Sequence, residues 1–214
     1  MRINVGCGKN TTKGWRNFDN SLSLWFAKLG FLSKILFKLK IFDQSEYQYI
    51  QFCRSHGIEY GDVVKGLSIQ PGSVDVLYSS HMIEHLDLIE VEQFLENAKK
   101  ILRSGGGIIR LVVPDLRKFV QRYLETGDAD AFVKETLLGQ TKPRTILQKI
   151  RALFVGPQGH CWAYDGKSLC ELLMRHGFVN VQILSPGETR IKDPGELDLR
   201  ERESQSVFVE AEKP

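Results

Sequence analysis

The amino-terminal end of the chain constrains its fold more than any other segment. Residues 2–8 read Arg-Ile-Asn-Val-Gly-Cys-Gly, a short β-branched run that breaks into two glycines spaced by one residue. This pattern predicts a buried strand that ends in a tight turn. Glycines in such a turn let the backbone approach a bound nucleoside closely, because no Cβ stands in the way. The segment therefore predicts a cofactor-binding loop and leaves the cofactor open.

Short β-branched runs alternate with helical patterns along the rest of the chain. We expect strands over residues 2–6, 74–78, 108–113, 179–184 and 207–210. Apolar residues recur at helical spacing over 91–102 and 116–124, the second run following Asp115 as its N-cap, and a third helix is expected over 168–176. Such alternation predicts a mostly parallel α/β sheet covered by helices on both faces. Ligands of these sheets bind at the carboxyl ends of the strands.

Two stretches, residues 22–42 and 132–154, interrupt this alternation. Both mix apolar side chains with lysines or arginines. We expect helical insertions near 20–58 and 128–158 within a single domain over residues 1–214. The lysines break any apolar run long enough to span a membrane. Three roles remain open for the insertions: cover for the core, a lid over the active site, or a basic amphipathic face that contacts a membrane surface.

Composition places the chain among ordinary globular proteins. It has 214 residues and a net charge of +3, and this mild charge argues against a dedicated nucleic-acid binder. Four cysteines occur without a C-x-x-C pair, and no signal peptide precedes the first strand. We therefore expect a cytoplasmic protein with reduced thiols that serve mainly as small buried hydrophobes.

The spacing around the glycines excludes the common pyrophosphate-binding loops. A dinucleotide loop needs a third glycine, where this chain has Thr11, and an acidic residue about 20 positions farther on. Asp19 comes too early for that role, since a helix and a strand cannot fit between it and the loop. A P-loop needs Gly-Lys-Ser/Thr, which does not follow here.

Several segments, taken in order, carry a resemblance to a known family. They are residues 4–8, 14–15, 17–19, 62, 73–86, 102–107, 112–115, 159–160, 162, 164–165, 169 and 177–178. Each segment is weakly specific, but their order and spacing together resemble class I S-adenosylmethionine-dependent methyltransferases, in particular a small bacterial type-11-like branch. The resemblance covers most of the chain apart from the two insertions. It implies a Rossmann-like, seven-stranded, mostly parallel sheet and S-adenosylmethionine as the cofactor.

The resemblance also implies which residues bind the cofactor. Gly6 and Gly8 would pass close to its methionine part, Asp19 would accept hydrogen bonds from the ribose hydroxyls, and Asp62 would accept one from the adenine amino group. The full set of candidates is Asn4, Gly6, Cys7, Gly8, Asp19, Asp62, Ser79, Ser80 and His81. For the two aspartates, a turn or capping role is the alternative.

Two features depart from the family pattern. Asn4 stands where the family often has an acidic residue, and the helix that normally follows the glycine loop is nearly absent. These departures motivate an alternative function, namely a regulatory protein of the same fold that binds the cofactor without turnover.

The candidate catalytic residues are His160, His81 and Glu84. The resemblance implies methyl transfer to a small molecule or glycan, and we expect a hydroxyl of a saccharide or metabolite as the acceptor. A general base assists transfer to a hydroxyl, and histidine is its usual source. His160 is the best candidate to face the acceptor, with a role in fixing loop geometry as the alternative. His85 is expected to be structural.

A rival motif occupies the same region. Residues 81–85 match H-x-x-E-H, the inverted signature of zinc peptidases, in which two histidines on one helix face bind zinc and Glu84 acts as the base. His81, however, follows the predicted strand so closely that it falls on a turn before any helix begins. We therefore expect no metal and keep the metallopeptidase only as a minor alternative.

Overall fold

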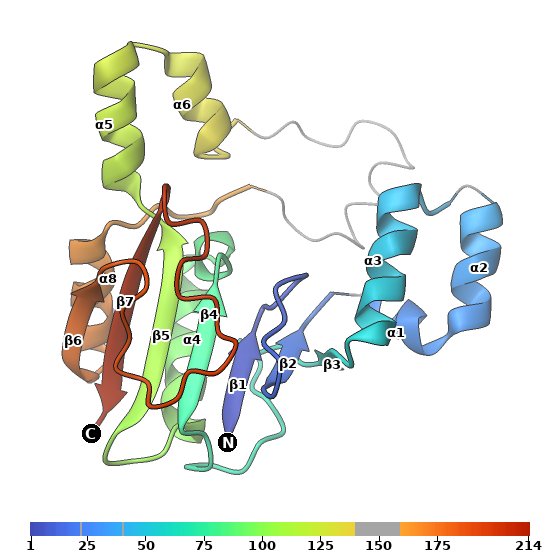
Figure 1. The fold of residues 1–214 in the computed structure, drawn as a ribbon, viewed down its shortest axis with the longest axis horizontal. Helices are drawn as coiled ribbons and strands as arrows, with labels where there is room; N and C mark the ends of the chain where they lie inside the picture. Colours follow the sequence, from blue (N-terminus) through green and yellow to red (C-terminus); the bar gives the residue numbers. More distant parts are fainter. Residues whose placement is uncertain (22, 40, 140–158) are drawn as a thin grey trace.

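A seven-stranded sheet forms the centre of the protein (Figure 1). The computed structural model describes residues 1–21, 23–39, 41–139 and 159–214. The strands are β1 (Arg2–Val5), β2 (Arg16–Asp19), β3 (Glu59–Tyr60), β4 (Val76–Ser80), β5 (Gly107–Pro114), β6 (Val179–Leu184) and β7 (Ser206–Lys213), in the order β3-β2-β1-β4-β5-β7-β6. β7 runs antiparallel to its neighbours β5 and β6, and the other neighbouring strands pair in parallel. The mostly parallel, Rossmann-like sheet is therefore confirmed.

The helices of the described residues fall largely where apolar periodicity predicts them. They are α1 (Ser23–Lys28), α2 (Gly30–Lys38), α3 (Gln44–Ser55), the 3-10 turn η1 (Ile83–His85), α4 (Leu88–Ile101), α5 (Leu116–Thr126), α6 (Ala129–Glu135) and α8 (Gly166–Arg175). The expected helices correspond to α4, α5 and α8. Asp115 caps α5 by accepting a hydrogen bond from the Arg117 backbone N–H at 3.1 Å. Gly127, with φ of 68°, ends that helix in the left-handed conformation.

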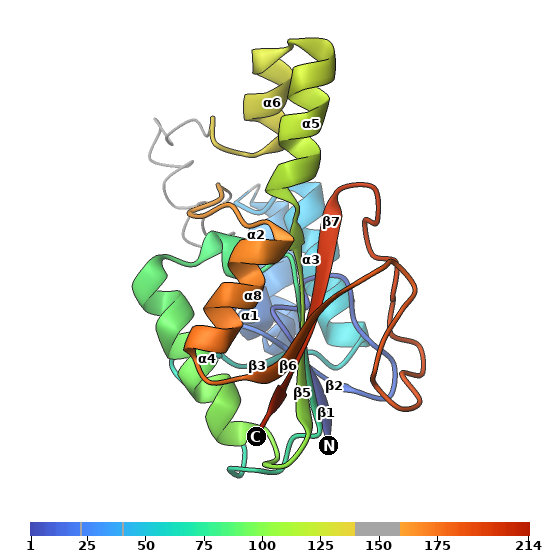
Figure 2. The same cartoon turned by 90° about the vertical axis from the view of Figure 1, so that its left-hand side faces the viewer.

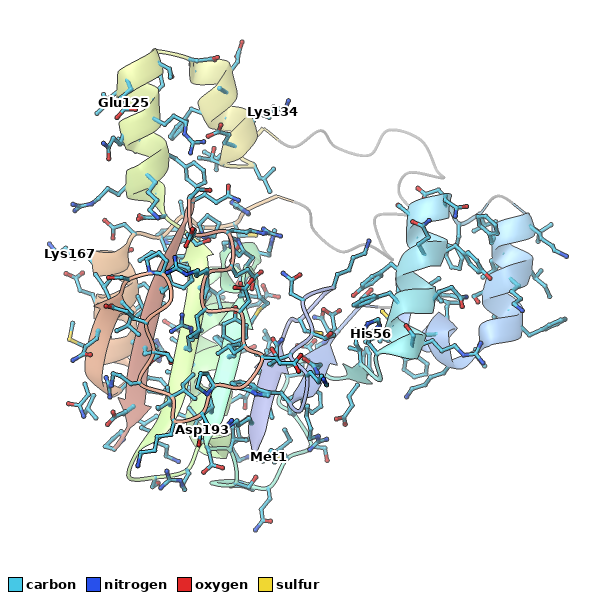
Figure 3. All side chains as sticks on the ribbon, in the orientation of Figure 1. Met1, His56, Glu125, Lys134, Lys167 and Asp193 are labelled. Atoms are coloured by element: carbon cyan, nitrogen blue, oxygen red, sulfur yellow. The ribbon has the colours of Figure 1, made fainter. Side chains whose placement is uncertain are left out.

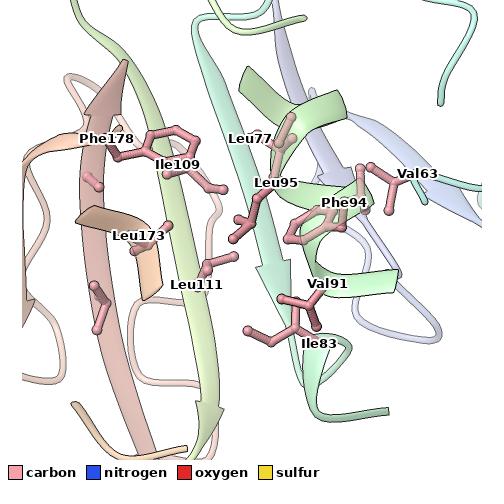
Figure 4. Close-up of a cluster of buried hydrophobic side chains, with 14 of the residues drawn as sticks. Val63, Leu77, Ile83, Val91, Phe94, Leu95, Ile109, Leu111, Leu173 and Phe178 are labelled. Carbon is pink, nitrogen blue, oxygen red and sulfur yellow. The ribbon is translucent and has the colours of Figure 1, made fainter. Parts of the chain in front are cut away.

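One face of the sheet is covered by α4 and α8 (Figure 2). Phe94 and Leu95 of α4 and Leu173 of α8 are fully buried in the main apolar cluster. Figure 4 shows these side chains close to β4 and β5, with Ile83 of η1 beside Val91. The buried Ile83 anchors the segment that follows β4, and this matters for the site described below.

Part of the cover on the other face of the sheet is an irregular segment. The long connection between β6 and β7, residues 185–205, lies over this face (Figure 2). Ile191 and Leu197 of this connection pack in an apolar cluster with Tyr78 and Phe208 of the sheet. The connection supplies its own apolar side chains, and so the sheet is covered here without a helix among the described residues.

Polar contacts tie this connection to strands β5 and β1. The fully buried Arg110 of β5 donates to the Glu210 carboxylate at 2.6 Å and to the Glu188 carbonyl at 3.0 Å. At the amino-terminal edge, where Figure 3 labels Asp193 near Met1, the Arg2 guanidinium donates to the carbonyl of Lys192 at 2.7 Å.

The first insertion is helical, as expected, and lies beside the β2–β3 edge of the sheet (Figure 1). α1, α2 and α3 pack around a cluster of their own that contains Leu24, Ile50, Cys53 and, from the glycine loop, Cys7. Residues 22 and 40 lie outside the described residues. None of the described helices has the length and apolar character needed to cross a membrane.

The second insertion is described only in part. α6 packs against α5, with the rings of Tyr123 and Phe132 5.7 Å apart. The two helices rise above the carboxyl ends of the parallel strands (Figures 1 and 2). The rest of the predicted insertion, residues 140–158, lies outside the described residues.

Candidate active site

The strand order creates a switch point between β1 and β4. From β1 the chain proceeds to β2 and β3 on one side, and then returns to β4 and β5 on the other. In open α/β sheets, ligands bind at the carboxyl ends of the strands beside such a reversal. The glycine loop follows β1 and residues 79–81 end β4 or follow it, so two predicted site segments meet at this point.

The glycine loop needs its glycines for two different reasons. Gly6 and Gly8 both have positive φ, 65° and 50°, a conformation that other residues rarely adopt. A Cβ on Gly6 would overlap the Met82 side chain, so this glycine permits close packing between the loop and the segment after β4. A Cβ on Gly8 would meet no atom within 4 Å. Gly8 therefore borders open space in which a ligand can approach the backbone.

Asp19 ties the loop to the end of β2. Its carboxylate accepts hydrogen bonds from the backbone N–H of Gly8 at 2.9 Å and of Ser21 at 2.8 Å. Burial raises the pKa of Asp19 above its ordinary value of 3.8, and these two backbone hydrogen bonds lower the pKa in part. Each carboxylate oxygen keeps a second lone pair, and so the group can still accept hydroxyl donors.

Asn4 and Cys7 shape the loop from behind. Asn4 is 1% exposed, and its amide donates to the Asn10 carbonyl at 2.8 Å. The same amide lies 3.3 Å from Thr12 Oγ1. The buried Cys7 packs toward α3, and burial raises the pKa of its thiol far above the usual range. These two predicted cofactor residues are therefore directed into the protein, unlike Gly8.

Asp62 follows β3 next to the end of β2, where Gly61 donates its backbone N–H to the Asp19 carbonyl at 3.0 Å. One Asp62 oxygen accepts the Val64 backbone N–H at 3.1 Å, and the other lies 3.2 Å from Lys65 Nζ. Asp62 thus forms the turn that we left open as its alternative role. It also lines an open hollow with Phe18, among other residues, at this edge of the sheet.

His81 occupies a strained turn between β4 and η1. Its φ is 49°, and its backbone N–H donates to the Val112 carbonyl at 2.9 Å. The ring Nε2 lies 3.0 Å from Ser206 Oγ, and Nδ1 lies 3.3 Å from a Glu84 carboxylate oxygen. His81 precedes η1, as predicted, and so it does not share a face of an α-helix with His85 as the zinc-peptidase motif requires.

Glu84 is the most unusual side chain of the site. It is 1% exposed, and neither carboxylate oxygen accepts a hydrogen bond from the residues that the structure describes. The buried hydroxyls of Ser79 and Ser80, at the end of β4, likewise make none within the same residues. Buried polar groups without partners are uncommon and often mark functional sites.

A distant segment brings His160 to this carboxylate. The Glu84 carbonyl accepts hydrogen bonds from the backbone N–H of Cys161 at 2.7 Å and of Trp162 at 3.1 Å. The His85 and His160 ring centroids are 5.0 Å apart. Burial lowers the pKa of His160 below its ordinary value of 6.5, although the nearby Glu84 carboxylate raises it in part. The neutral ring therefore offers a lone pair.

Tyr164 is a site residue that we did not single out from the sequence. Its hydroxyl is buried and has no hydrogen-bond partner among the described residues. Burial, with a further contribution from Glu84, raises the pKa of Tyr164 to about 12. Its position just before the Asp165 N-cap of α8, in a segment that contributes to the family resemblance, was the available signal.

Comparisons with known proteins match part of this chain to a protein family. Residues 36–110 match the family model described as a methyltransferase domain. The match includes Asp62 and residues 79–85, and it begins after the glycine loop. A search of curated proteins found no match.

Solved structures share the fold over nearly the whole chain. A possible histamine N-methyltransferase from Thermotoga maritima is 16% identical with a TM-score of 0.52, covering 100% of this chain and 82% of its own. An S-adenosylmethionine-dependent methyltransferase from Archaeoglobus fulgidus is 14% identical with a TM-score of 0.51, covering 99% and 85%. One from Mesorhizobium loti is 15% identical with a TM-score of 0.50, covering 100% and 90%. The matched domain and the shared fold together support a class I S-adenosylmethionine-dependent methyltransferase, with S-adenosylmethionine as its cofactor.

Proposed function

We propose that this methyltransferase acts on a hydroxyl of a small acceptor, a saccharide or another metabolite. The observation that carries the proposal is the buried polar cluster of His81, Glu84 and His160 at the carboxyl end of β4. The cluster lies beside the glycine loop, because Met82 contacts Gly6. Transfer between oxygen and a sulfonium requires alignment of the two reactants and exclusion of water, and a partly buried polar cluster suits both needs.

The described residues fit the cofactor. Gly8 borders open space, Asp19 is a buried carboxylate with acceptor capacity left, and the Ser79 hydroxyl has no partner among the described residues. We propose that Gly6 and Gly8 pass along the methionine part, Asp19 holds the ribose hydroxyls, and Asp62 the adenine. Asn4 and Cys7 hold the glycine loop in its conformation from the protein side and do not contact the cofactor. When bound, S-adenosylmethionine supplies an electrophilic methyl group.

The cluster would prepare the acceptor. His160 has a lone pair at neutral pH, because burial lowers its pKa, and we propose that it faces the acceptor hydroxyl and takes up its proton. The nearby Glu84 carboxylate partly raises the pKa of His160, and so it would stabilise this ring once it has taken up the proton. His81, held between Ser206 and Glu84, positions that carboxylate.

Calorimetry with S-adenosylmethionine and S-adenosylhomocysteine tests the cofactor site. Asp19→Ala should weaken binding at least tenfold, since a hydrogen bond to a charged group contributes about 1.5–3 kcal/mol. Asp75→Ala is the matched control, because Asp75 is a half-exposed carboxylate that pairs with Arg103 and the amino terminus. Absence of binding by the wild-type protein, or equal binding by the Asp19 variant, would refute the assignment.

The second candidate is a regulatory protein that binds the cofactor without turnover. It is favoured by the loop, in which Asn4 offers no carboxylate and no helix follows the glycines. Transfer of a labelled methyl group into the small-molecule fraction of a cell extract separates the two. We expect a labelled product with the wild-type protein and with His56→Gln, and little with His160→Gln. Persistent absence of product despite tight cofactor binding would favour the regulator.

We also propose that α1 and α2 contact an anionic membrane surface, within one domain of residues 1–214 whose insertions lie near 20–58 and 128–158. Phe31 and Ile35 of α2 and its C-cap residue Leu39 recur every fourth residue and therefore lie on one side of the helix, yet Phe31 is 80% exposed and Leu39 64%. Lys34 and Lys38 flank this row, and residues 20–42 contain no acidic side chain. Exposed apolar and cationic side chains on one helix are typical of interfacial binding.

Sedimentation with liposomes tests this contact. Vesicles containing phosphatidylserine should bind the wild-type protein in a salt-sensitive way, and phosphatidylcholine vesicles much less. Phe31→Ser with Leu39→Ser should abolish binding, whereas Leu124→Ser, a change at a 76% exposed leucine of α5, should not. Failure to bind anionic vesicles would refute the proposal. A loss of hydrogen exchange in α1–α2 on cofactor binding would instead favour a lid.

A further inference from the structure

We propose that Glu84, His85 and His160 form a binding site for a divalent transition-metal cation that also coordinates the oxygen of the methyl acceptor. The inference rests on the proposed function, because the acceptor is the hydroxyl assigned there. Each of the three residues offers one ligand atom, and these atoms all lie within 4.8 Å of one another. A single cation at about 2.0–2.2 Å from each nitrogen and oxygen can satisfy such a set.

The strongest argument comes from the Glu84 carboxylate. It is almost fully buried, yet neither oxygen accepts a hydrogen bond from the described residues. Among the residues that the structure describes, its one ion-pair contact is with His81, whose Nδ1 lies 3.3 Å from one oxygen without hydrogen-bond geometry. Burying a carboxylate without compensation is unfavourable, and coordination of a cation is one of the ways in which proteins compensate it.

His85 makes the kind of hydrogen bond that metal-binding histidines usually make. His85 Nδ1 lies 3.0 Å from the Gly159 carbonyl, and so this nitrogen carries the proton and donates it there. The lone pair of His85 is thereby assigned to Nε2. Metal-binding histidines commonly use the second ring nitrogen in this way, which fixes the ring and its tautomer. The same contact holds the backbone next to His160, so one hydrogen bond orders parts of two ligands.

The ligand set indicates the class of metal and the chemistry. Two imidazoles and one carboxylate suit Zn²⁺, Mn²⁺, Fe²⁺ or Co²⁺ better than Mg²⁺ or Ca²⁺. Three protein ligands leave a position open, as in catalytic sites. A hydroxyl bound there loses its proton more easily because the cation stabilises the alkoxide. In the cation-bound enzyme, His160 would act on the acceptor through the metal instead of directly.

Methyl transfer at this site then proceeds with every bond and proton accounted for. The acceptor O–H bond breaks and its proton passes to water. The alkoxide oxygen forms a bond to the methyl carbon as the carbon–sulfur bond breaks, which leaves a methyl ether and the neutral thioether. No oxidant or reductant is needed.

This site differs from the one suggested by the H-x-x-E-H motif. That motif pairs His81 with His85, whereas the proposed site replaces His81 by His160 from a distant segment. Our expectation of no metal was based on the turn position of His81, and that argument does not apply to His160.

Metal titration of the full, chelator-stripped chain tests the proposal. We expect one Co²⁺ per chain with the visible absorption bands of a low-symmetry site, and competition by Zn²⁺ in calorimetry. Glu84→Gln and His160→Gln should each weaken Co²⁺ binding at least tenfold. His56→Gln, a change at an exposed histidine of the same chain, should leave it unchanged.

Circular dichroism and cofactor calorimetry on the same variants show whether they are folded. Absence of Co²⁺ and Zn²⁺ binding, or equal binding by folded Glu84→Gln protein, would overturn the metal site. Methyl transfer without metal would then leave the proposed function standing with His160 as the base. Loss of cofactor binding by the wild-type protein would refute the proposed function independently of the metal result.

Discussion

Asp19 and Glu84 are both buried carboxylates, but their surroundings prepare them for different partners. Two backbone N–H groups donate to Asp19, which keeps it ordered and ready to accept further hydroxyl donors. Glu84 receives none from the described residues and is surrounded by histidines. A hydrogen-bonded carboxylate suits a neutral ligand such as ribose, whereas an unpartnered one suits a cation.

At the residue scale we predict that cofactor affinity depends on pH through Asp19. Burial raises its pKa above 3.8, and so its protonation begins at higher pH than in an exposed aspartate. Affinity for S-adenosylhomocysteine, measured by calorimetry from pH 7 downward, should therefore fall before pH 3.8 is reached. Asp19→Asn should flatten this dependence and Asp75→Asn should not. An unchanged profile in Asp19→Asn would contradict the assignment.

Asp19 affects fold stability in the opposite direction to cofactor affinity: its contribution to stability grows as the pH falls. Because its pKa is raised in the folded state, its contribution to stability is greatest below the unfolded-state pKa and is lost as pH rises through the folded-state value. Ionised Asp19 thus lowers stability at neutral pH, which is typical of a group retained for binding rather than for folding.

Local spacing singled out some residues of the candidate site but not others. Gly6 and Gly8 could be singled out because adjacent residues indicate a tight turn, and Asp19 was singled out through the family resemblance. The Asn4 side chain points into the protein because of its contacts with residues 10–17. Tyr164 lies near Glu84 because of a contact between segments far apart in the sequence. Neither follows from a local pattern, and both roles emerged only with the fold.

At the element scale, the connection between β6 and β7 covers part of one sheet face with irregular chain. It is held by Arg110, which reaches Glu210 and the Glu188 carbonyl, while Thr189 Oγ1 also donates to Glu210 at 2.6 Å. Strands β1, β4, β5, β6 and β7 and helices α4, α5 and α8 could be predicted from periodicity, with β4 displaced by two residues from the expected 74–78. This cover could not, because an irregular segment has no period.

Arg110→Met should destabilise the fold by roughly 3–5 kcal/mol, since it leaves the buried Glu210 carboxylate without its cation. Urea denaturation followed by circular dichroism measures the change. Arg103→Met is the matched control, because the Arg103–Asp75 pair is half-exposed and should contribute no more than about 1 kcal/mol. Equal losses in the two variants would contradict this account of how the connection is held.

At the scale of the whole molecule, two groups of helices stand on either side of the carboxyl ends of the parallel strands. α1–α3 lie beside β2 and β3, and α5–α6 rise above β5 (Figure 1). The glycine loop and the polar cluster lie between them, at the switch point of the sheet. The strand order brings residues 4–8 and 79–85 together in the candidate site, and hydrogen bonds from Cys161 and Trp162 to the Glu84 carbonyl add residues 159–164.

A crystal structure of the protein with S-adenosylhomocysteine tests the central claim most directly. The account predicts the nucleoside beside Gly8, its ribose hydroxyls on the Asp19 carboxylate, and its sulfur directed toward Glu84 and His160. A nucleoside bound elsewhere, or no nucleoside beside Gly8 and Asp19 at saturating ligand, would contradict it.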